Sequence, residues 1–199
     1  MSIVTSTPPA APLPPQRLWT IADVAVLPSE LPTGPVRYEL DNGRLITMPP
    51  PGDIHSAVDS DIHHELKVQG EKRGFGEVRS EGGLILWRNP DRLVGPDSMF
   101  IAKASLPVRR SPEGYLETIP DLAVEVRSKN DSQAAIEAKV ADYLRAGVKV
   151  VWIVDPLKRC VTAYRANKLP ELFNENDLLT IPDVIPGFQM PVKNAFAKV

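Results

Sequence analysis

One strand–helix–strand unit near the middle of the chain limits its fold more than any other feature. Residues 122–126 and 148–154 are nearly continuous apolar runs, which are typical of strands covered on both faces. Residues 131–146 between them have helical spacing, and Gly147 stands at the C-terminal cap position. A helix between two such strands predicts a parallel pair joined by a right-handed crossover. We therefore expect an α/β fold.

Shorter patterns on both sides of this unit indicate further strands. Asp41-Asn42-Gly43 separates two β-prone runs, residues 36–40 and 44–48. An Asn-Gly pair between two such runs is a strong signal for a β-hairpin. The other β-prone runs are residues 76–80, 84–87, 98–102 and 159–164.

Two further segments have the spacing of helices. Residues 19–27 predict a short helix with Thr20 as its N-cap, and residues 53–72 predict a long one. Residues 103–119 are interpreted as a loop, and the segment after residue 167 is only weakly patterned. The inward stripe of the long helix is expected to comprise Ile54, His55, Ala57, Val58, Ile62 and Leu66.

Together these elements predict a central mixed β-sheet flanked by helices, with an added N-terminal β-hairpin. The chain has 199 residues, of which 43% are hydrophobic, and this is enough for one domain with a sizeable core. Five prolines stand among the first 18 residues, and such a segment buries too little apolar surface to order itself. We expect residues 1–18 to form a tail and residues 19–199 to form a single domain.

Charge and composition exclude several classes of protein and site. A net charge of −2 excludes a basic protein that coats nucleic acid. A lone cysteine, Cys160, excludes an internal disulfide framework and a zinc site with several thiolates. His55, His63 and His64 share one predicted helix, but their spacing does not suit a zinc site. The sequence has no secretory signal pattern and no apolar run of ~18–20 residues, so we expect a cytoplasmic protein without a membrane partner.

Three charged residues break the pattern of the segment that carries them. Glu125 lies within an apolar strand, where a carboxylate is costly unless it is paired, for example with Arg127, or bound to a cation. Lys139 falls within the apolar arc of its helix, so it either extends from the edge of that arc or points at an anion. Asp97 follows Gly-Pro at the start of a strand, where it serves either a turn or a ligand.

These three residues can meet at one edge of the predicted sheet. If the strand after Asp97 pairs beside the strand of Glu125, the crossover helix can bring the amine of Lys139 toward both carboxylates. Two carboxylates with open positions between them suit Mg²⁺ or Mn²⁺. A nearby lysine can stabilise developing negative charge or help to deprotonate the attacking water. Such a group of residues is suited to the hydrolysis of a phosphodiester.

Several motifs of the chain resemble those of the PD-(D/E)XK nuclease superfamily, and more closely those of the Uma family of restriction-endonuclease-like proteins. The resemblance spans roughly residues 35–165 in the right order and implies a restriction-endonuclease-like core. The matching segments are Tyr38-Glu39-Leu40-Asp41-Asn42-Gly43, Pro50-Pro51 with His55, Gly95-Pro96-Asp97, Pro120-Asp121-Leu122-Ala123-Val124-Glu125-Val126-Arg127-Ser128, Lys139 with Tyr143, and Gly147-Val148 with Trp152-Ile153-Val154-Asp155-Pro156.

The resemblance implies roles for individual residues. Asp97 and Glu125 would be the metal-binding acids, with Val126 as a further metal ligand, and Lys139 would be the superfamily lysine moved to the following helix. It also implies that Glu39 and His55 contribute to catalysis. Arg127 stands at the usual lysine position, where its permanent charge prevents it from acting as a base. Arg127 and Lys129 would contact the substrate phosphate.

Three functions remain open at this stage. The first is a Mg²⁺- or Mn²⁺-dependent endonuclease that hydrolyses DNA and that can act as a homodimer, as superfamily members often do. The second is a catalytically silent nuclease fold used for nucleic-acid binding or assembly, since Arg127 replaces the usual lysine. The third is hydrolysis of a phosphodiester other than DNA. Asp97 and Glu125 pointing to opposite sides of the sheet would exclude both hydrolases.

Overall fold

A six-stranded mixed sheet forms the centre of the computed structural model, which describes residues 17–110, 114–129 and 131–199. Most of the predicted tail, residues 1–16, lies outside the described residues. Only β9 and β10 run parallel, and every other neighbouring pair is antiparallel. The strand order is β12 (Glu171–Phe173), β11 (Cys160–Tyr164), β10 (Val150–Asp155), β9 (Leu122–Val126), β8 (Ser98–Ala102) and β5 (Gly76–Ser80).

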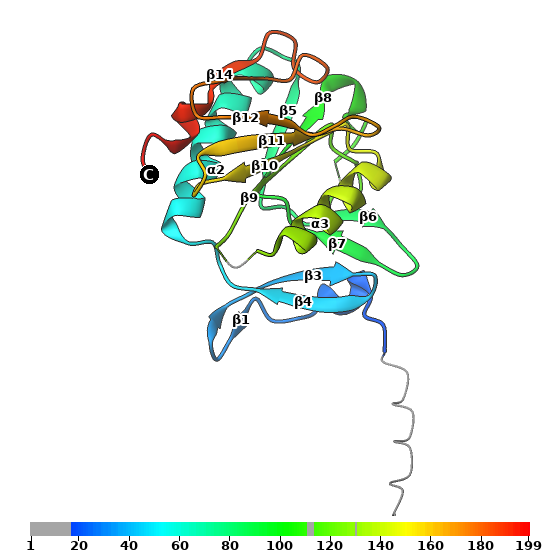
Figure 1. Ribbon diagram of the computed structural model, residues 1–199. Coiled ribbons are helices and arrows are strands. Elements are labelled where there is room, and N and C mark those ends of the chain that lie inside the picture. The colour runs from blue at the N-terminus through cyan, green and yellow to red at the C-terminus, as the bar shows by residue number, and fades with distance from the viewer. Residues whose placement is uncertain (1–16, 111–113, 130) are drawn as a thin grey trace, which may run out of the picture.

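The parallel pair confirms the predicted strand–helix–strand unit. Helix α3 (Gln133–Ala146) connects β9 to β10 and lies on one face of the sheet (Figure 1). It begins two residues later than predicted, because the side chain of Ser132 accepts a hydrogen bond from the Ala135 amide and caps the helix there. Gly147 ends it in the left-handed conformation, with φ of 105°.

The opposite face of the sheet is covered by α2 (Asp53–Leu66) and the π-helical turn that follows it, η1 (Lys67–Glu71). Val58, Ile62 and Leu66 are fully buried against the even-numbered residues of β9 and β10. The odd-numbered residues of the same strands instead pack toward α3, since side chains alternate along a strand. The prediction that Ile54 belongs to the buried stripe is wrong, because its side chain is 51% exposed at the start of α2.

The predicted hairpin is confirmed, but it belongs to a separate four-stranded sheet. Asn42 and Gly43 form its two-residue turn, and their φ values of 49° and 81° match a type I′ turn. No strand was predicted between residues 87 and 98, whereas Arg92–Val94 form β7, which joins the hairpin to β6 (Leu84–Trp87). This sheet has the order β4 (Arg44–Met48), β3 (Arg37–Asp41), β7 (Arg92–Val94) and β6 (Leu84–Trp87).

Short elements complete the N-terminal half. Thr20 is the N-cap of helix α1 (Ile21–Val24) as predicted, and it forms a reciprocal capping box with Asp23, but the helix ends three residues earlier than predicted. The described part of the predicted loop 103–119 contains one turn of 3-10 helix, η2 (Lys103–Ser105). A two-stranded ribbon is formed by β1 (Glu30–Leu31) and β2 (Gly34–Pro35).

The weakly patterned C-terminal segment contributes to the core. It forms the ribbon of β13 (Leu178–Thr180) and β14 (Gln189–Pro191), followed by the 3-10 helix η3 (Val192–Phe196) beside α2. Ile181, Ile185 and Phe188 from this segment are buried in the cluster that includes α2. Within the described part of the chain, every helix is too short or too polar to cross a membrane.

Candidate active site

Asp97 lies beside the end of β9, close to Glu125. Strands β8 and β9 pair Ser98 with Val124 at the end of their antiparallel register, so Asp97 directly precedes the paired part of β8 and Glu125 directly follows that of β9. The Val126 amide donates to Asp97 Oδ2 at 2.7 Å, and the charge of Asp97 acts on Glu125 to raise its pKa. Continuation of the register by one residue would place the two acids opposite each other, on one face of the sheet.

Lys139 connects this pair of acids to Glu39 from the small sheet. Its Nζ lies 3.0 Å from the Glu125 carboxylate and 3.1 Å from Glu39 Oε1. Lys139 is two turns into α3, and Glu39 is buried in β3. Of the two interpretations of this lysine, the structure favours the one in which the ammonium points at anions.

Tyr143, which was named only as part of a motif shared with the Uma family, is a further member of this site. It lies one helical turn after Lys139, and its hydroxyl donates a 2.5 Å hydrogen bond to Glu125 Oε1. The ring is fully buried. The available signal was the four-residue spacing from Lys139, which places both side chains on one side of α3.

Burial and crowding of carboxylates change the charge equilibrium at Glu125. Burial raises the pKa of Glu125 to about 7, and the nearby charges of Asp97 and Glu39 act in the same direction. Lys139 and Tyr143 act in the opposite direction without cancelling that rise. The Glu125 carboxyl therefore changes charge close to neutral pH.

The same charges keep Lys139 protonated. Burial by itself would lower the pKa of Lys139, but the carboxylates of Glu125 and Glu39 outweigh that effect and raise it well above its usual value. Lys139 is consequently an ammonium ion throughout the neutral range. This charge state suits electrostatic stabilisation better than proton abstraction.

Backbone and side-chain contacts hold Glu39 in place. Its Oε1 accepts a hydrogen bond from the Gly95 amide at 2.9 Å, and its Oε2 lies 3.9 Å from Arg92 Nη1. Arg92 is itself buried and donates to the Leu40 carbonyl and to Asp142 at 2.9 and 2.7 Å. The sequence analysis did not identify Arg92, since it lies in the unanticipated strand β7.

His55 approaches Asp97 from the first turn of α2. Its Nε2 lies 3.2 Å from Asp97 Oδ2, whereas its Nδ1 is buried and has no hydrogen-bond partner among the described residues. Burial lowers the pKa of His55, but the hydrogen bond and charge of Asp97 outweigh it and give a net rise. Beside this contact, Ser98 Oγ donates to Asp59 and lies 3.2 Å from His63 Nδ1. The structure therefore brings Asp97, His55 and a polar network of α2 together.

A family model described as "Putative restriction endonuclease", Uma2, matches residues 27–193 of the chain. The chain belongs to the Uma2 family. This membership confirms the resemblance identified in the sequence, and the match extends beyond the predicted span at both ends.

A solved structure has the same fold as this Uma2 chain. It is described as "a putative nuclease belonging to DUF820" from Anabaena variabilis ATCC 29413, and its TM-score is 0.73. The match covers 89% of the Uma2 chain and 97% of the Anabaena chain at 22% identity, which confirms the predicted fold class. No curated protein matches the Uma2 chain.

Arg127 and Lys129 of this Uma2 protein lie outside the carboxylate cluster. Arg127 contacts Asp155 at 3.4 Å and the Asp131 carbonyl at 3.2 Å, so the alternative in which it pairs with Glu125 is wrong. Its side chain nonetheless lines a hollow of about 100 Å³ beside Glu125 and Lys139. Lys129 is exposed after the end of β9.

The donors available in the Uma2 site suit a hard cation that retains water. Among the described residues, no three side chains of His, Cys, Asp or Glu form a group that could hold a metal ion. Asp97 and Glu125 nevertheless supply two carboxylates near each other, and Val126, whose backbone carbonyl could be a further ligand, follows Glu125 in sequence and donates its amide to Asp97. Mg²⁺ typically keeps several waters and binds through one or two carboxylates plus substrate phosphates. The donor set therefore fits Mg²⁺ or Mn²⁺ better than zinc.

Proposed function

We propose that this protein is a metal-dependent endonuclease that hydrolyses phosphodiester bonds of DNA. The observation that carries the proposal is the gathering of charged groups at the end of β9, where the Val126 amide donates to Asp97 and the Lys139 ammonium lies 3.0 Å from Glu125. A partly buried acid, a second acid close to it and a partly buried lysine together suit phosphoryl chemistry, in which negative charge must be held and stabilised. Membership of the Uma2 family supports the same reaction class.

Asp97 and Glu125, with the carbonyl oxygen of Val126, would hold Mg²⁺ or Mn²⁺. When bound, such a cation supplies Lewis-acid polarisation of the phosphate and lowers the pKa of a coordinated water. His55 keeps Asp97 oriented through its Nε2 contact, and Tyr143 does the same for Glu125 through its hydroxyl. These contacts hold the acids in place before substrate arrives.

Lys139 acts in this proposal as a fixed positive charge. Because Glu39 and Glu125 keep it protonated, it stabilises the negative charge that grows on the phosphate rather than accepting a proton from water. Glu39 is a positioning residue, since its carboxylate holds the ammonium from the small sheet at 3.1 Å. Arg127, at the border of the same hollow, is placed to contact a neighbouring phosphate.

The decisive experiment measures cleavage of a supercoiled plasmid by the full chain with Mg²⁺ or Mn²⁺. We expect Asp97→Asn and Glu125→Gln to abolish cleavage while their circular dichroism and melting temperature remain those of a folded protein. Glu117→Gln is the matched control, because the Glu117 side chain is 69% exposed and pairs only at the surface. Wild-type protein that cuts no DNA with any divalent metal would contradict the proposal.

A catalytically silent nuclease fold is the second candidate. It is favoured by one observation, since Arg127 stands at the usual lysine position and its guanidinium contacts Asp155. In this case the protein would bind nucleic acid without hydrolysing it, and Mn²⁺ titration would show no site at Asp97 and Glu125. Calorimetric Mn²⁺ binding that disappears in either acid variant would eliminate this candidate.

A further inference from the structure

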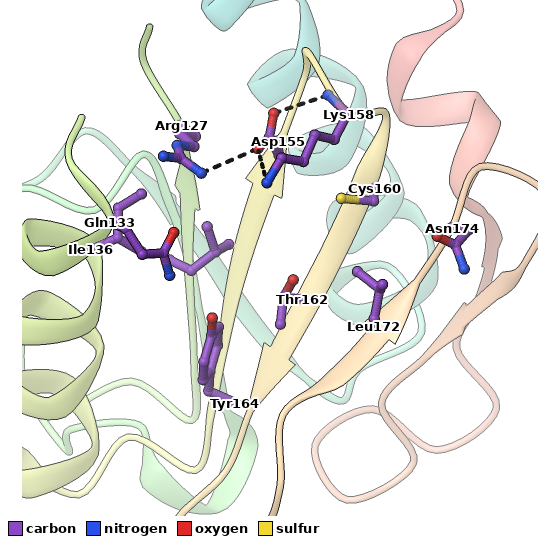
Figure 2. Close-up of a pocket in the computed structure, with 11 residues that line it drawn as sticks. Arg127, Gln133, Ile136, Asp155, Lys158, Cys160, Thr162, Tyr164, Leu172 and Asn174 are labelled. Atoms are coloured by element: carbon purple, nitrogen blue, oxygen red, sulfur yellow. Dashed lines mark hydrogen bonds and ion pairs between the residues drawn. The ribbon is translucent and has the colours of Figure 1, made fainter. Parts of the chain in front are cut away.

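A second groove lies beside the candidate active site, on the part of the central sheet that α3 does not cover. It has a volume of about 280 Å³ and runs over β10, β11 and β12 (Figure 2). Thr162 and Tyr164 project into it from β11, while the alternate residues Val161 and Ala163 are buried in the core on the α2 side. The groove therefore occupies the open face of a strand whose other face is fully packed.

This groove adjoins the hollow at Glu125 and Lys139. Arg127, Ile136 and Ile153 line both cavities. Arg127 follows Glu125 by two residues, which is about 6.6 Å along a strand. A nucleic-acid strand with one phosphate at Glu125 can thus present a neighbouring nucleotide to the groove.

The groove combines cationic, aromatic and polar groups. Arg127 and Lys158 both contact Asp155, at 3.4 and 4.0 Å, so one carboxylate positions two cations at one end of the groove. Tyr164 supplies a ring at the other end, and Leu172, 56% exposed, supplies an apolar surface on β12. A positively charged track beside an aromatic platform is how proteins bind single-stranded nucleic acid.

Two further side chains can recognise the edge of a base. The hydroxyl of Thr162 and the side-chain amide of Asn174, an exposed residue, both line the groove. A hydroxyl and an amide together offer both donors and acceptors. A base that stacks on Tyr164 would lie within the same groove as these polar groups.

We propose that this groove binds one unpaired nucleotide of the DNA strand whose neighbouring phosphate lies at Glu125 and Lys139. The inference rests on the proposed function and specifies its substrate as DNA with a single-stranded segment. A base in an intact duplex is paired and stacked, so it cannot enter a groove over a sheet without leaving the helix. Tyr164 stacks on the base, and Arg127 and Lys158 contact the phosphates on either side.

The test measures binding of the full chain to a fluorescein-labelled single-stranded oligonucleotide and to a blunt duplex of the same sequence, in EDTA. We expect the single strand to bind more tightly than the duplex. Tyr164→Ala should weaken single-strand binding by about 5-fold or more, the fold-change that corresponds to base–aromatic stacking, whereas Tyr164→Phe retains it. Lys158→Ala should reduce the dependence of log Kd on log salt by about 0.7, the contribution of one phosphate contact on a single strand.

The matched control is Lys193→Ala, which removes an exposed lysine of η3 outside the groove and should bind as the wild type does. Lys158 is itself 71% exposed, so its variant tests the groove even if Tyr164→Ala lowers stability. As a direct readout, an oligonucleotide that carries 5-iodouracil should photocrosslink to Tyr164, as mapped by mass spectrometry.

Three results would overturn the groove proposal. The first is equal affinity for the single strand and the duplex. The second is a folded Tyr164→Ala variant that binds the single strand as tightly as the wild type does. The third is a wild-type dimer that Tyr164→Ala converts to a monomer, because the groove would then be an interface between two copies of the chain. Failure of hydrolysis is distinguishable from all three. If the wild-type protein binds the single strand through Tyr164 but cleaves no DNA, the groove proposal stands and the nuclease proposal fails. If the protein cuts duplex DNA and Tyr164→Ala leaves that cleavage unchanged, only the groove proposal fails.

Discussion

Replacement of Lys139 by methionine would test the electrostatic balance of the site without substrate. The variant keeps a side chain of similar length but leaves Glu39 and Glu125 facing each other without their shared cation. Removal of one partner of a buried ion pair typically costs 3–5 kcal/mol. Because the Lys139 side chain is 22% exposed, we expect the lower end of that range, about 3 kcal/mol.

The loss should depend on pH in a defined direction. Without Lys139 the pKa of Glu125 rises further above its unfolded value of 4.5, because its nearest positive charge is gone. An acid with a raised pKa holds its proton in the folded state, so stability is greatest at low pH and falls as pH rises toward the folded pKa. We therefore expect a larger deficit near about pH 8 than near about pH 5.5, by at least about 1 kcal/mol.

Urea unfolding followed by tryptophan fluorescence measures both effects, since Trp152 is fully buried in the core. The unfolding free energies of wild type and Lys139→Met are compared in EDTA and then with excess Mg²⁺. A ligand that binds only the folded state adds to its stability. If a cation binds between the acids, loss of the Lys139 charge should strengthen that binding, so Mg²⁺ should stabilise the variant more than the wild type. Lys193→Met is the surface control. A deficit below about 0.5 kcal/mol in EDTA at every pH would refute the reasoning.

Three further changes test other parts of the structure. Tyr143→Phe removes a hydrogen bond that lowers the pKa of Glu125, so the acidic limb of the pH–rate profile for DNA cleavage should move to higher pH, and an unchanged profile would contradict this role. Gly76→Ala would place a Cβ 2.1 Å from a backbone carbonyl oxygen of β8, so urea titration should show a loss of about 1–3 kcal/mol or more, whereas Gly82→Ala, with its nearest contact at 3.6 Å, serves as a tolerated control. Asp121→Asn should cost about 1–3 kcal/mol at neutral pH. Burial raises the pKa of Asp121, but hydrogen bonds to a lysine and a backbone amide outweigh it and lower the pKa. Its stabilisation is therefore present above the unfolded value of 3.8 and is lost as pH falls through the folded pKa, so wild type and variant should converge in strong acid.

The inner strands of the central sheet could be predicted because β8 to β11 are short, largely apolar runs with clear ends. Residues 98–102 and 122–126 agree with β8 and β9 at both ends. Two charged residues of the candidate site could be anticipated for the same reason, since Glu125 and Lys139 contradict an otherwise clear apolar pattern. Local pattern therefore identified the residues that the fold later brought together.

The elements that the sequence analysis missed depend on partners far away in the chain. Strand β7 has only three residues. It forms a local hairpin with β6, but its other neighbour, β3, lies about 50 positions earlier, so its pairing with β3 leaves no local signal. Ribbon β13–β14 is equally short, and its surroundings are buried only because α2 packs over them. Tyr143 was missed as a site residue because an aromatic side chain in an apolar arc is also what a core requires.

The acids that hold Lys139 belong to two different sheets. Glu39 is supplied by the small sheet, whereas Glu125 belongs to the large one. The position of the Lys139 ammonium therefore depends on how the two sheets pack against each other. The hydrogen bond from Arg92 of β7 to Asp142 of α3 helps to fix that packing. In the proposed mechanism, substitutions along that seam can change the position of the Lys139 ammonium from a distance, so variants of the hairpin offer a route to altered activity that leaves Asp97 and Glu125 in place.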